Sequence, residues 1–317
     1  MKIRIALFCC LLAIGCSKKN DPVVNIPPNV PAPPVTPIVT ETPVTVYVAV
    51  SGWINSGQNV AKFWKDSIPT FVSDSTKSET LTGMAVSGKD VYLSGYLQGT
   101  YWPYAQYWKN GVSVALEVGT AQWGYTTGIL VSGTDVYVSG YSVNPAPGGG
   151  YTYIAMYWKN GVRVNVSDGT KFAYANAIAV SGNDVYVAGV ESDPPNTNGI
   201  GRYWKNGVPV SLTDGTKPTA LSGIYISGND VYAVGNITVG TTGEIAAYWK
   251  NGNPVYLSQT ASQTGFANAN ALVVLGSDVY VAGRMDYYPV YWKNGVAVHL
   301  TPGNLNDNAM SIFVIPR

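Results

Sequence analysis

The stretch Tyr157-Trp158-Lys159-Asn160-Gly161 decides the fold, because near copies of it recur along the chain. An aromatic-Trp-Lys unit occurs six times, and five of the six copies continue with Asn-Gly. Asn-Gly between two apolar runs is a strong hairpin signal, since both residues accept the positive φ of a type I′ turn. The six units are Phe63-Trp64-Lys65, Tyr107-Trp108-Lys109, Tyr157-Trp158-Lys159, Tyr203-Trp204-Lys205, Tyr248-Trp249-Lys250 and Tyr291-Trp292-Lys293.

A second repeated signal precedes each unit. Val-Tyr pairs begin at Val46, Val91, Val136, Val185, Val231 and Val279, with spacings of 45, 45, 49, 46 and 48 residues. In the third repeat, four strand-like runs follow one another, at 136–141, 154–159, 162–166 and 175–180. The connections are too short for crossover helices, which predicts antiparallel meanders. Four-strand units of this length are typical of propeller blades.

The two ends of the repeated region predict how the blades close. The region begins with a Val-Tyr strand that has no inner strand before it, and residues 308–315 form an inner-strand pattern with nothing after it. Placing 308–315 beside 46–50 would complete one blade and remove the exposed sheet edges. We therefore expect an all-β fold, a six-bladed β-propeller of four-stranded antiparallel blades over residues 44–317, closed by the C-terminal strand. An open β-solenoid is the alternative.

The layout resembles Kelch-type propellers, where an inner strand leads to an apolar strand ending in glycine and then to a strand with a late Trp. This chain has Ala-Gly, Ser-Gly or Val-Gly where Kelch repeats have a Gly-Gly doublet. The Tyr-Trp-Lys-Asn-Gly repeat resembles one found in bacterial surface lipoproteins. These resemblances imply the fold and an exported protein, and they imply no chemistry.

The N-terminal residues have the pattern of an export signal. Lys2 and Arg4 precede an apolar run at 5–14 that is too short to span a bilayer. Residues 12–16 resemble the bacterial lipobox, which implies that residues 1–15 are removed and that Cys16 is lipidated. Residues 16–43 are then a proline-rich linker, for which an extended conformation is expected. An ordinary signal peptide is the alternative.

This pattern indicates where the protein is located in the cell. We expect an outer-membrane lipoprotein, attached to the membrane through its lipid anchor only, with its body at the cell surface or facing the periplasm. Charge is sparse, with 19 Lys and Arg against 18 Asp and Glu and no basic cluster. The sequence therefore argues against nucleic acid as a partner. We expect a monomer.

Catalytic motifs are hard to find in this sequence. The single histidine, His299, has no recognisable partner motif, and no phosphate loop or zinc spacing appears. Recurring aspartates occupy the same step of a tight turn, which favours turn hydrogen bonding over a metal or acid-base role. They are Asp90, Asp135, Asp184, Asp230 and Asp278. The sequence thus predicts no catalytic residue, no metal and no cofactor.

Loops fall into two sets on opposite faces of the meander. Ser-Gly-x-Asp and Lys-Asn-Gly turns share a uniform face, whereas the other loops vary in length and content, as binding loops do. Aromatic residues outside the repeat fall on this variable face, where they suit sugar rings or protein hot spots. Packing within long loops is the alternative interpretation. These residues are Trp53, Tyr101, Trp102, Tyr104, Trp123, Tyr125, Tyr151, Tyr153, Tyr174, Tyr287 and Tyr288.

A polar residue at one step of each inner strand forms a second candidate set. The set, expected at the mouth of an axial channel, comprises Thr82, Thr127, Asn176, Ser222, Asn270 and Asn308. These side chains would bind a polar ligand or satisfy backbone groups of the inner strands. A Gly or Ala follows each one, as expected where inner strands crowd the axis.

Together these patterns favour a binding module over an enzyme. Its expected ligand is a glycan or an envelope protein, recognised through the variable face. An extracellular polysaccharide lyase or hydrolase and an envelope-assembly scaffold remain alternatives, because a propeller fold does not determine function. Glu191 and Asp193 share one loop, but glycoside hydrolysis needs two carboxylates facing across a substrate.

Overall fold

The computed structural model describes residues 45, 47–53, 59–66, 68–72, 77–99, 102–121, 123–146, 148–193, 198–240, 243–258, 266–286, 288–300 and 307–315. The expected signal segment and linker, residues 1–43, lie outside these ranges. All regular secondary structure within them is β-strand. No helix among the described residues is long and apolar enough to cross a membrane.

The strands form six antiparallel sheets, named blades 1 to 6 in chain order. Blade 1 contains β1 (Tyr47–Trp53), β2 (Asn59–Lys65) and β3 (Ile68–Phe71). Blade 2 contains β4 (Ser78–Ser87), β5 (Asp90–Gln98), β6 (Pro103–Lys109) and β7 (Val112–Ala115). Blade 3 contains β8 (Trp123–Ser132), β9 (Asp135–Pro145), β10 (Tyr151–Lys159) and β11 (Val162–Asn165).

The remaining three blades repeat the pattern of blades 2 and 3. Blade 4 contains β12 (Phe172–Ser181), β13 (Asp184–Ser192), β14 (Ile200–Lys205) and β15 (Val208–Ser211). Blade 5 contains β16 (Thr219–Ser227), β17 (Asp230–Val239), β18 (Gly243–Lys250) and β19 (Asn253–Tyr256). Blade 6 contains β20 (Ala267–Leu275), β21 (Asp278–Met285), β22 (Tyr288–Lys293) and β23 (Val296–His299).

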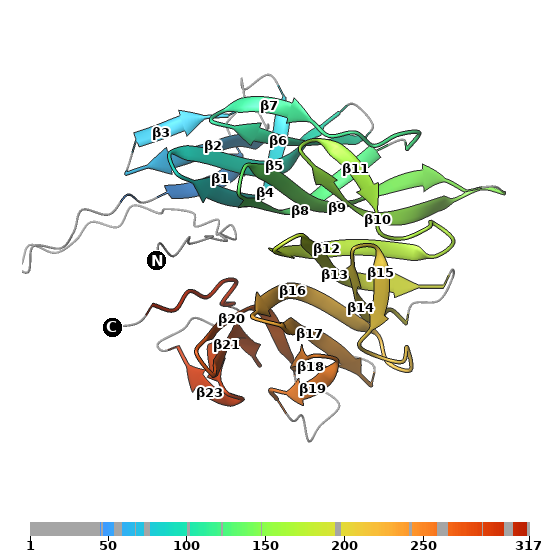
Figure 1. Ribbon diagram of the computed structural model, residues 1–317, viewed down its shortest axis with the longest axis vertical. Helices are drawn as coiled ribbons and strands as arrows, with labels where there is room; N and C mark the ends of the chain where they lie inside the picture. Colours follow the sequence, from blue (N-terminus) through green and yellow to red (C-terminus); the bar gives the residue numbers. More distant parts are fainter. Residues whose placement is uncertain are drawn as a thin grey trace, which may run out of the picture.

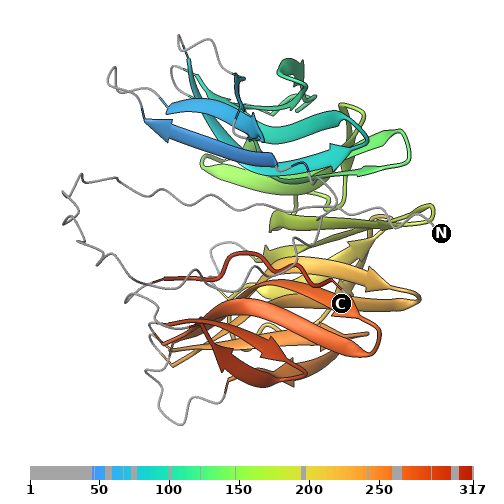
Figure 2. The same cartoon turned by 90° about the vertical axis from the view of Figure 1, so that its left-hand side faces the viewer.

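Each blade is a meander in which consecutive strands pair. The blades follow one another in chain order around an axis, as the colour sequence shows in Figures 1 and 2. This all-β arrangement of six antiparallel sheets is consistent with a six-bladed propeller, as the repeats predict. Blades 2 to 6 have four strands, and blade 1 has three among the described residues.

The Asn-Gly turns adopt the backbone expected for them. Asn160 has a φ of 53° and Gly161 a φ of 87° between β10 and β11, and the other four Asn-Gly pairs are alike. The strands on the variable side are longer than the sequence suggests, since pairing of β9 with β10 continues to Pro145 and Tyr151.

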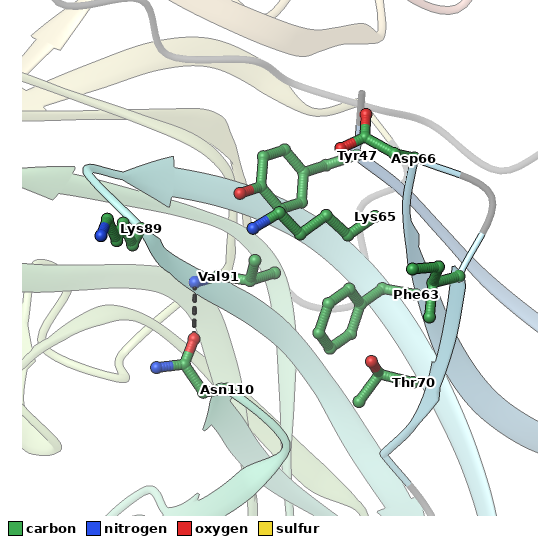
Figure 3. Close-up of a pocket in the computed structure, with 9 residues that line it drawn as sticks. Tyr47, Phe63, Lys65, Asp66, Thr70, Lys89, Val91 and Asn110 are labelled. Atoms are coloured by element: carbon green, nitrogen blue, oxygen red, sulfur yellow. Dashed lines mark hydrogen bonds between the residues drawn. The ribbon is translucent and has the colours of Figure 1, made fainter. Parts of the chain in front are cut away.

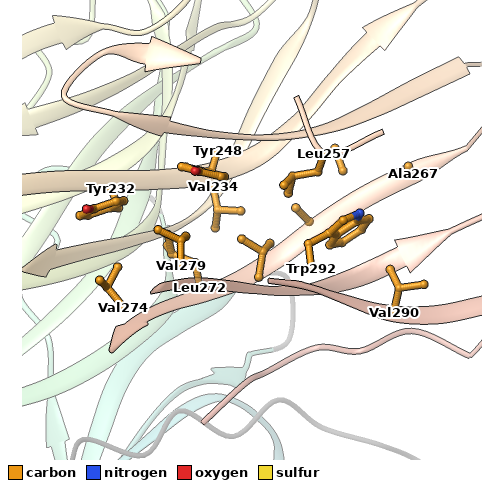
Figure 4. Close-up of a cluster of buried hydrophobic side chains, with 13 residues drawn as sticks. Tyr232, Val234, Tyr248, Leu257, Ala267, Leu272, Val274, Val279, Val290 and Trp292 are labelled. Atoms are coloured by element: carbon orange, nitrogen blue, oxygen red, sulfur yellow. The ribbon is translucent and has the colours of Figure 1, made fainter. Parts of the chain in front are cut away.

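The core lies between blades, where the repeated Trp of one blade packs on the blade before it. Trp292 of blade 6 lies in one buried cluster with blade 5 residues such as Val234 and Leu257, as Figure 4 shows. Trp158 of blade 3 shares a buried cluster with Tyr107 of blade 2 in the same way. Five of these indoles are buried: Trp108, Trp158, Trp204, Trp249 and Trp292. A blade between two neighbours has both faces of its sheet covered, which explains why the strands are apolar at nearly every position.

A β-bulge in each inner strand explains the recurring glycine. Pairing of β8 with β9 skips Thr127 between Thr126 and Gly128. The skip directs the carbonyl of Tyr125 at Gly140, where a Cβ would overlap that oxygen. Gly95, Gly189, Gly235 and Gly283 meet the same obstacle in blades 2, 4, 5 and 6. The Ser-Gly and Ala-Gly ends of these strands are therefore packing requirements.

The expected closure of the ring is not formed in this structure. Among the described residues, β1 pairs only with β2, and residues 307–315 are not in a strand. The segment lies against blade 6 instead, where the Ala309 amide donates to the Gly283 carbonyl at 3.3 Å. Sequence offers a reason: Val50 stands in repeat 1 where the other five repeats have the obligatory glycine. The same bulged pairing beside β1 would place a carbonyl against a valine.

Candidate functional site

The uniform face carries one hydrogen-bonded clasp in each of blades 2 to 6. In blade 3, Asn160 Oδ1 accepts from the Val136 amide at 2.9 Å, and Asn160 Nδ2 donates to Asp135 Oδ1 at 2.8 Å. Lys159 Nζ lies 2.8 Å from Asp135 Oδ2 and 5.4 Å above the Tyr137 ring. The clasp joins the two tight turns of a blade, so its aspartate serves the fold, as predicted.

Electrostatics agree with this structural role. The Lys159 ammonium, followed by the Asn160 amide, lowers the pKa of the Asp135 carboxyl. The pKa values of Asp184, Asp230 and Asp278 are also lowered, mainly by the lysine of the same blade. The pKa of Asp90 is lowered mainly by its hydrogen bond with Asn110. Elsewhere, Asp168 Oδ1 accepts from the amide and hydroxyl of Thr170, so this aspartate stabilises a local turn.

Blade 1 departs from the clasp, and a shallow pocket of about 330 Å³ lies there. Thr45 and Asp66 stand where the other blades have Asp and Asn. The pocket wall includes Tyr47, Phe63 and Lys65 of blade 1 and Lys89 of blade 2, as Figure 3 shows. Lys65 lies 5.9 Å above the Tyr47 ring, as the lysine does in the clasps, but the aspartate of the clasp is replaced by Thr45.

Five of the six residues in the polar set, all except Asn308, are the bulge residues of the inner strands. Thr127 donates to the Ala175 carbonyl at 2.8 Å, and Asn176 donates to the Leu221 carbonyl at 2.8 Å. Ser222 reaches Ala269 in the same way, at 2.6 Å. These three side chains bind backbone at the bulge of the next blade and so link blades to one another. Thr82 belongs to it through Thr126 Oγ1, and Asn270 donates to Asn308 Oδ1 and the Ala309 carbonyl.

On the variable face, two tryptophans and a tyrosine form an aromatic cluster between blades 2 and 3. The rings of Trp102 and Trp123 stack with centroids 4.1 Å apart and planes 6° from parallel. Tyr151 meets the edge of Trp123 at 4.9 Å and 65°. Trp123 is 6% exposed, whereas Trp102 is 40% and Tyr151 is 41% exposed. We call these three residues the Trp cluster.

A tyrosine network continues from blade 2 to blade 4. Tyr96 contacts Tyr125 edge-on at 5.3 Å, and Tyr125 stacks on Tyr141 at 5.1 Å. Tyr174 lies 5.0 Å from both Tyr141 and Tyr153. Burial raises the pKa of Tyr174 to about 12, and it raises the pKa of Tyr141 and of Tyr125 as well. Tyr125, Tyr141 and Tyr174 therefore stay neutral at physiological pH.

The structure thus divides the predicted aromatic residues. Trp123, Tyr125, Tyr153 and Tyr174 lie in strands, not in loops as expected, and their rings mainly pack against neighbouring rings, whereas Trp102, Tyr104 and Tyr151 remain exposed. Tyr288 is exposed on blade 6, with the His299 ring 6.5 Å away, and it belongs to neither group. Tyr101, Tyr287 and the side chain of Trp53 lie outside the described residues.

Sequence reasoning missed Tyr96, Tyr141 and Phe172, which complete the network. Tyr96 and Tyr141 directly follow the repeated Ser-Gly, where the later repeats have Val190, Asn236 and Arg284. This departure from the repeat was the available signal. Both residues lie within the repeated strand, so the departure does not stand out in the sequence.

Charged side chains gather on the variable side of blade 4. Glu191 Oε2 lies 2.9 Å from Arg202 Nη1, and Lys171 Nζ lies 3.0 Å from Asp193 Oδ1. Glu191 and Asp193 are therefore held by basic partners. No group of three or more His, Cys, Asp or Glu within the described ranges is placed to hold a metal ion.

Comparisons with known proteins bear on the fold. No protein-family model and no curated protein matches this chain. A Mycobacterium tuberculosis puromycin-hydrolyzing peptidase is similar, with a TM-score of 0.54 and 12% identity over 81% of this chain and 45% of the peptidase. Pyrococcus horikoshii acylaminoacyl peptidase gives a TM-score of 0.50 and 10% identity over 80% of this chain and 43% of the peptidase. The chain spans less than half of either peptidase, and at these identities the likeness shows the fold alone.

Proposed function

We propose that this protein is a binding module that recognises a glycan or an envelope protein through the variable face of blades 2 to 4. The observation that carries the proposal is the Trp cluster, in which a buried indole supports an exposed one. Exposed aromatic rings held rigidly are typical of binding hot spots. Repeated residues on the opposite face are occupied in clasps, which leaves the loops that break the repeat to carry recognition.

The position of the protein in the cell is part of this proposal. The lipobox-like residues 12–16 and the proline-rich residues 16–43 support a lipid-anchored protein of the outer membrane. A long extended linker would let the variable face reach ligands away from the bilayer. Globomycin-sensitive processing and palmitate labelling, both lost in Cys16→Ala, are the expected results for this anchor.

Trp102→Ala tests the binding proposal directly. The full-length chain is screened against glycan and envelope-protein arrays, and the variant is then compared with the unchanged chain on whatever binds. Because Trp102 lies at the surface and is 40% exposed, the variant should fold, and we expect it to lose at least about tenfold in affinity. Tyr288→Ala is the matched control, since it removes an equally exposed aromatic residue from blade 6. A folded Trp102→Ala variant with unchanged binding contradicts the proposal.

We also propose that the ring closes by placing residues 309–312 beside β1. Blades 1 and 6 each present an apolar surface that other blades bury. Val48 is 41% exposed, whereas its counterpart Leu93 is 1% exposed, and Leu300 is 42% exposed, whereas its counterpart Leu116 is 6% exposed. Covering such surfaces is favourable. Only the part of the segment beyond the bulge would pair, because Val50 excludes the rest.

Paired cysteines test this closure. The register of the other blades places Met310 opposite Val48, as Met84 is opposite Leu93. In a Val48→Cys, Met310→Cys variant, we expect a disulfide under mild oxidation, because opposite strand residues lie within bonding reach. Thr70→Cys with Met310→Cys places the first cysteine on the outer strand and is the control. Equal cross-linking in both variants, or none in either, contradicts the closure.

A further inference from the structure

We infer that the ligand of the variable face is an uncharged glycan, and that the exposed face of the Trp102 ring is the platform on which a sugar ring stacks. This inference rests on the proposed binding function, since it names the ligand class for the same surface. Three observations carry it: the geometry of the indole pair, the aromatic residues beside it and the lack of charge in the loops that hold it.

The indole pair is organised before any ligand arrives. Trp102 lies parallel to the buried Trp123 ring and turns its other face to solvent. Its backbone is also fixed, because the Gly99 amide donates to the Trp102 carbonyl at 3.0 Å. A side chain already held in place loses little freedom on binding. The result is a flat apolar surface of constant orientation, which matches the C–H face of a pyranose ring.

Tyr151 borders this platform, and a second exposed tyrosine stands two residues from Trp102 in the chain. Tyr151 leans edge-on against Trp123 and is 41% exposed, and Tyr104 follows Trp102 in the chain and is 55% exposed. Each phenol hydroxyl both donates and accepts hydrogen bonds. Sugar hydroxyls at the rim of a stacked ring need such partners. A platform with polar hydroxyls at its border is therefore suited to a sugar.

Charge is nearly absent from the loops around the platform. Segments 98–104, 116–125 and 144–153 contain one charged residue, Glu117. Arg163 of β11 reaches this region and turns its guanidinium toward the backbone, where Nη1 donates to the Val118 carbonyl at 3.0 Å. An anionic ligand would give up hydration here without a cationic partner in these segments. The ionic groups on the variable side of blade 4 are already paired with one another.

The experiment uses the full-length chain in detergent. Binding is measured by calorimetry and by Trp fluorescence against neutral polysaccharides (glucan, mannan, xylan and galactan), acidic ones (polygalacturonate and sulfated dextran) and solubilised envelope proteins. We expect binding to a neutral polysaccharide, with equal affinity at about 0.05 and 0.5 M salt, since no charges are involved. Trp102→Ala should weaken it about tenfold or more, Trp102→Phe should retain part of it, and Tyr288→Ala should leave it unchanged.

The outcomes separate this inference from the function on which it rests. Binding only to acidic polysaccharides, with affinity that falls as salt rises, overturns the uncharged class. A protein ligand that requires Trp102 overturns the inference and leaves the proposed function intact. Neutral-glycan binding that a folded Trp102→Ala variant retains overturns both, as does a lack of binding throughout the panel.

Discussion

The two faces of this protein differ in how they use the repeat. On the uniform face, blades 2 to 6 repeat one clasp of Asp, Lys, Asn and Tyr with nearly the same distances. On the variable face, the Trp cluster lies at blades 2 and 3, a tyrosine network extends to blade 4, and ionic groups follow beside it. Residues that recur in blades 2 to 6 stabilise each blade, whereas residues that differ from the repeat make contacts that occur only once.

Replacing the repeated glycine opposite the bulge is expected to have the largest effect and tests whether the repeat is a packing requirement. Gly140→Ala places a methyl group against the Tyr125 carbonyl and the Trp158 ring. We expect a loss of about 3 kcal/mol in the free energy of unfolding, measured by denaturant titration. Gly133→Ala is the control, since only its φ of 63° opposes alanine, and it should cost about 1 kcal/mol. Equal losses in the two variants would show that overlap at Gly140 relaxes freely.

The clasp offers a smaller effect on the uniform face. Asn160→Ala removes both side-chain hydrogen bonds and places alanine at a φ of 53°. We expect a loss of about 1 to 2 kcal/mol in stability, with ligand binding unchanged. Thermal unfolding and the binding assay on the same sample measure the two effects. Weaker ligand binding in this variant would break the division between the faces.

Alkaline pH tests the contribution of the buried tyrosine network on the variable face to stability. Because the pKa of Tyr174 is raised to about 12 in the folded protein, the tyrosine ionises more readily when unfolded. Its contribution to stability is present below the unfolded pKa of 10.0 and is lost as pH rises through about 12. Tyr174→Phe keeps the ring and should move alkaline unfolding to higher pH, as followed by circular dichroism. An unchanged midpoint contradicts this prediction.

Acid pH gives the smallest expected effect, on the uniform face. The pKa of Asp135 is lowered from 3.8 by Lys159 and Asn160. Its contribution is therefore present above pH 3.8 and is lost as pH falls through the lower folded pKa. Asp135→Asn should be less stable than the unchanged chain near neutral pH and equal to it in strong acid. A difference that stays constant across a pH series of unfolding curves would refute this.

Much of the fold could be read from the sequence because its signals are local. The Asn-Gly pairs predict hairpins, and the observed φ values at Asn160 and Gly161 confirm them. The turn role of Asp135 also followed from its repeated position, and the structure shows its partners. Closure could not be read in the same way, because it depends on whether residues 309–312 and β1 meet across the whole ring.

The candidate site was predicted only in part, for a physical reason. Sequence identified Trp102, Trp123 and Tyr151 as departures from the repeat, because a comparison of the repeats shows which residues do not recur. It could not show that Trp123 is buried beneath Trp102, or that Tyr141 joins Tyr125 to Tyr174. The sequence determines each blade, since its strands and turns depend on neighbouring residues. The tertiary structure decides which aromatic rings meet, since those contacts join blades and depend on how each sheet packs on the next.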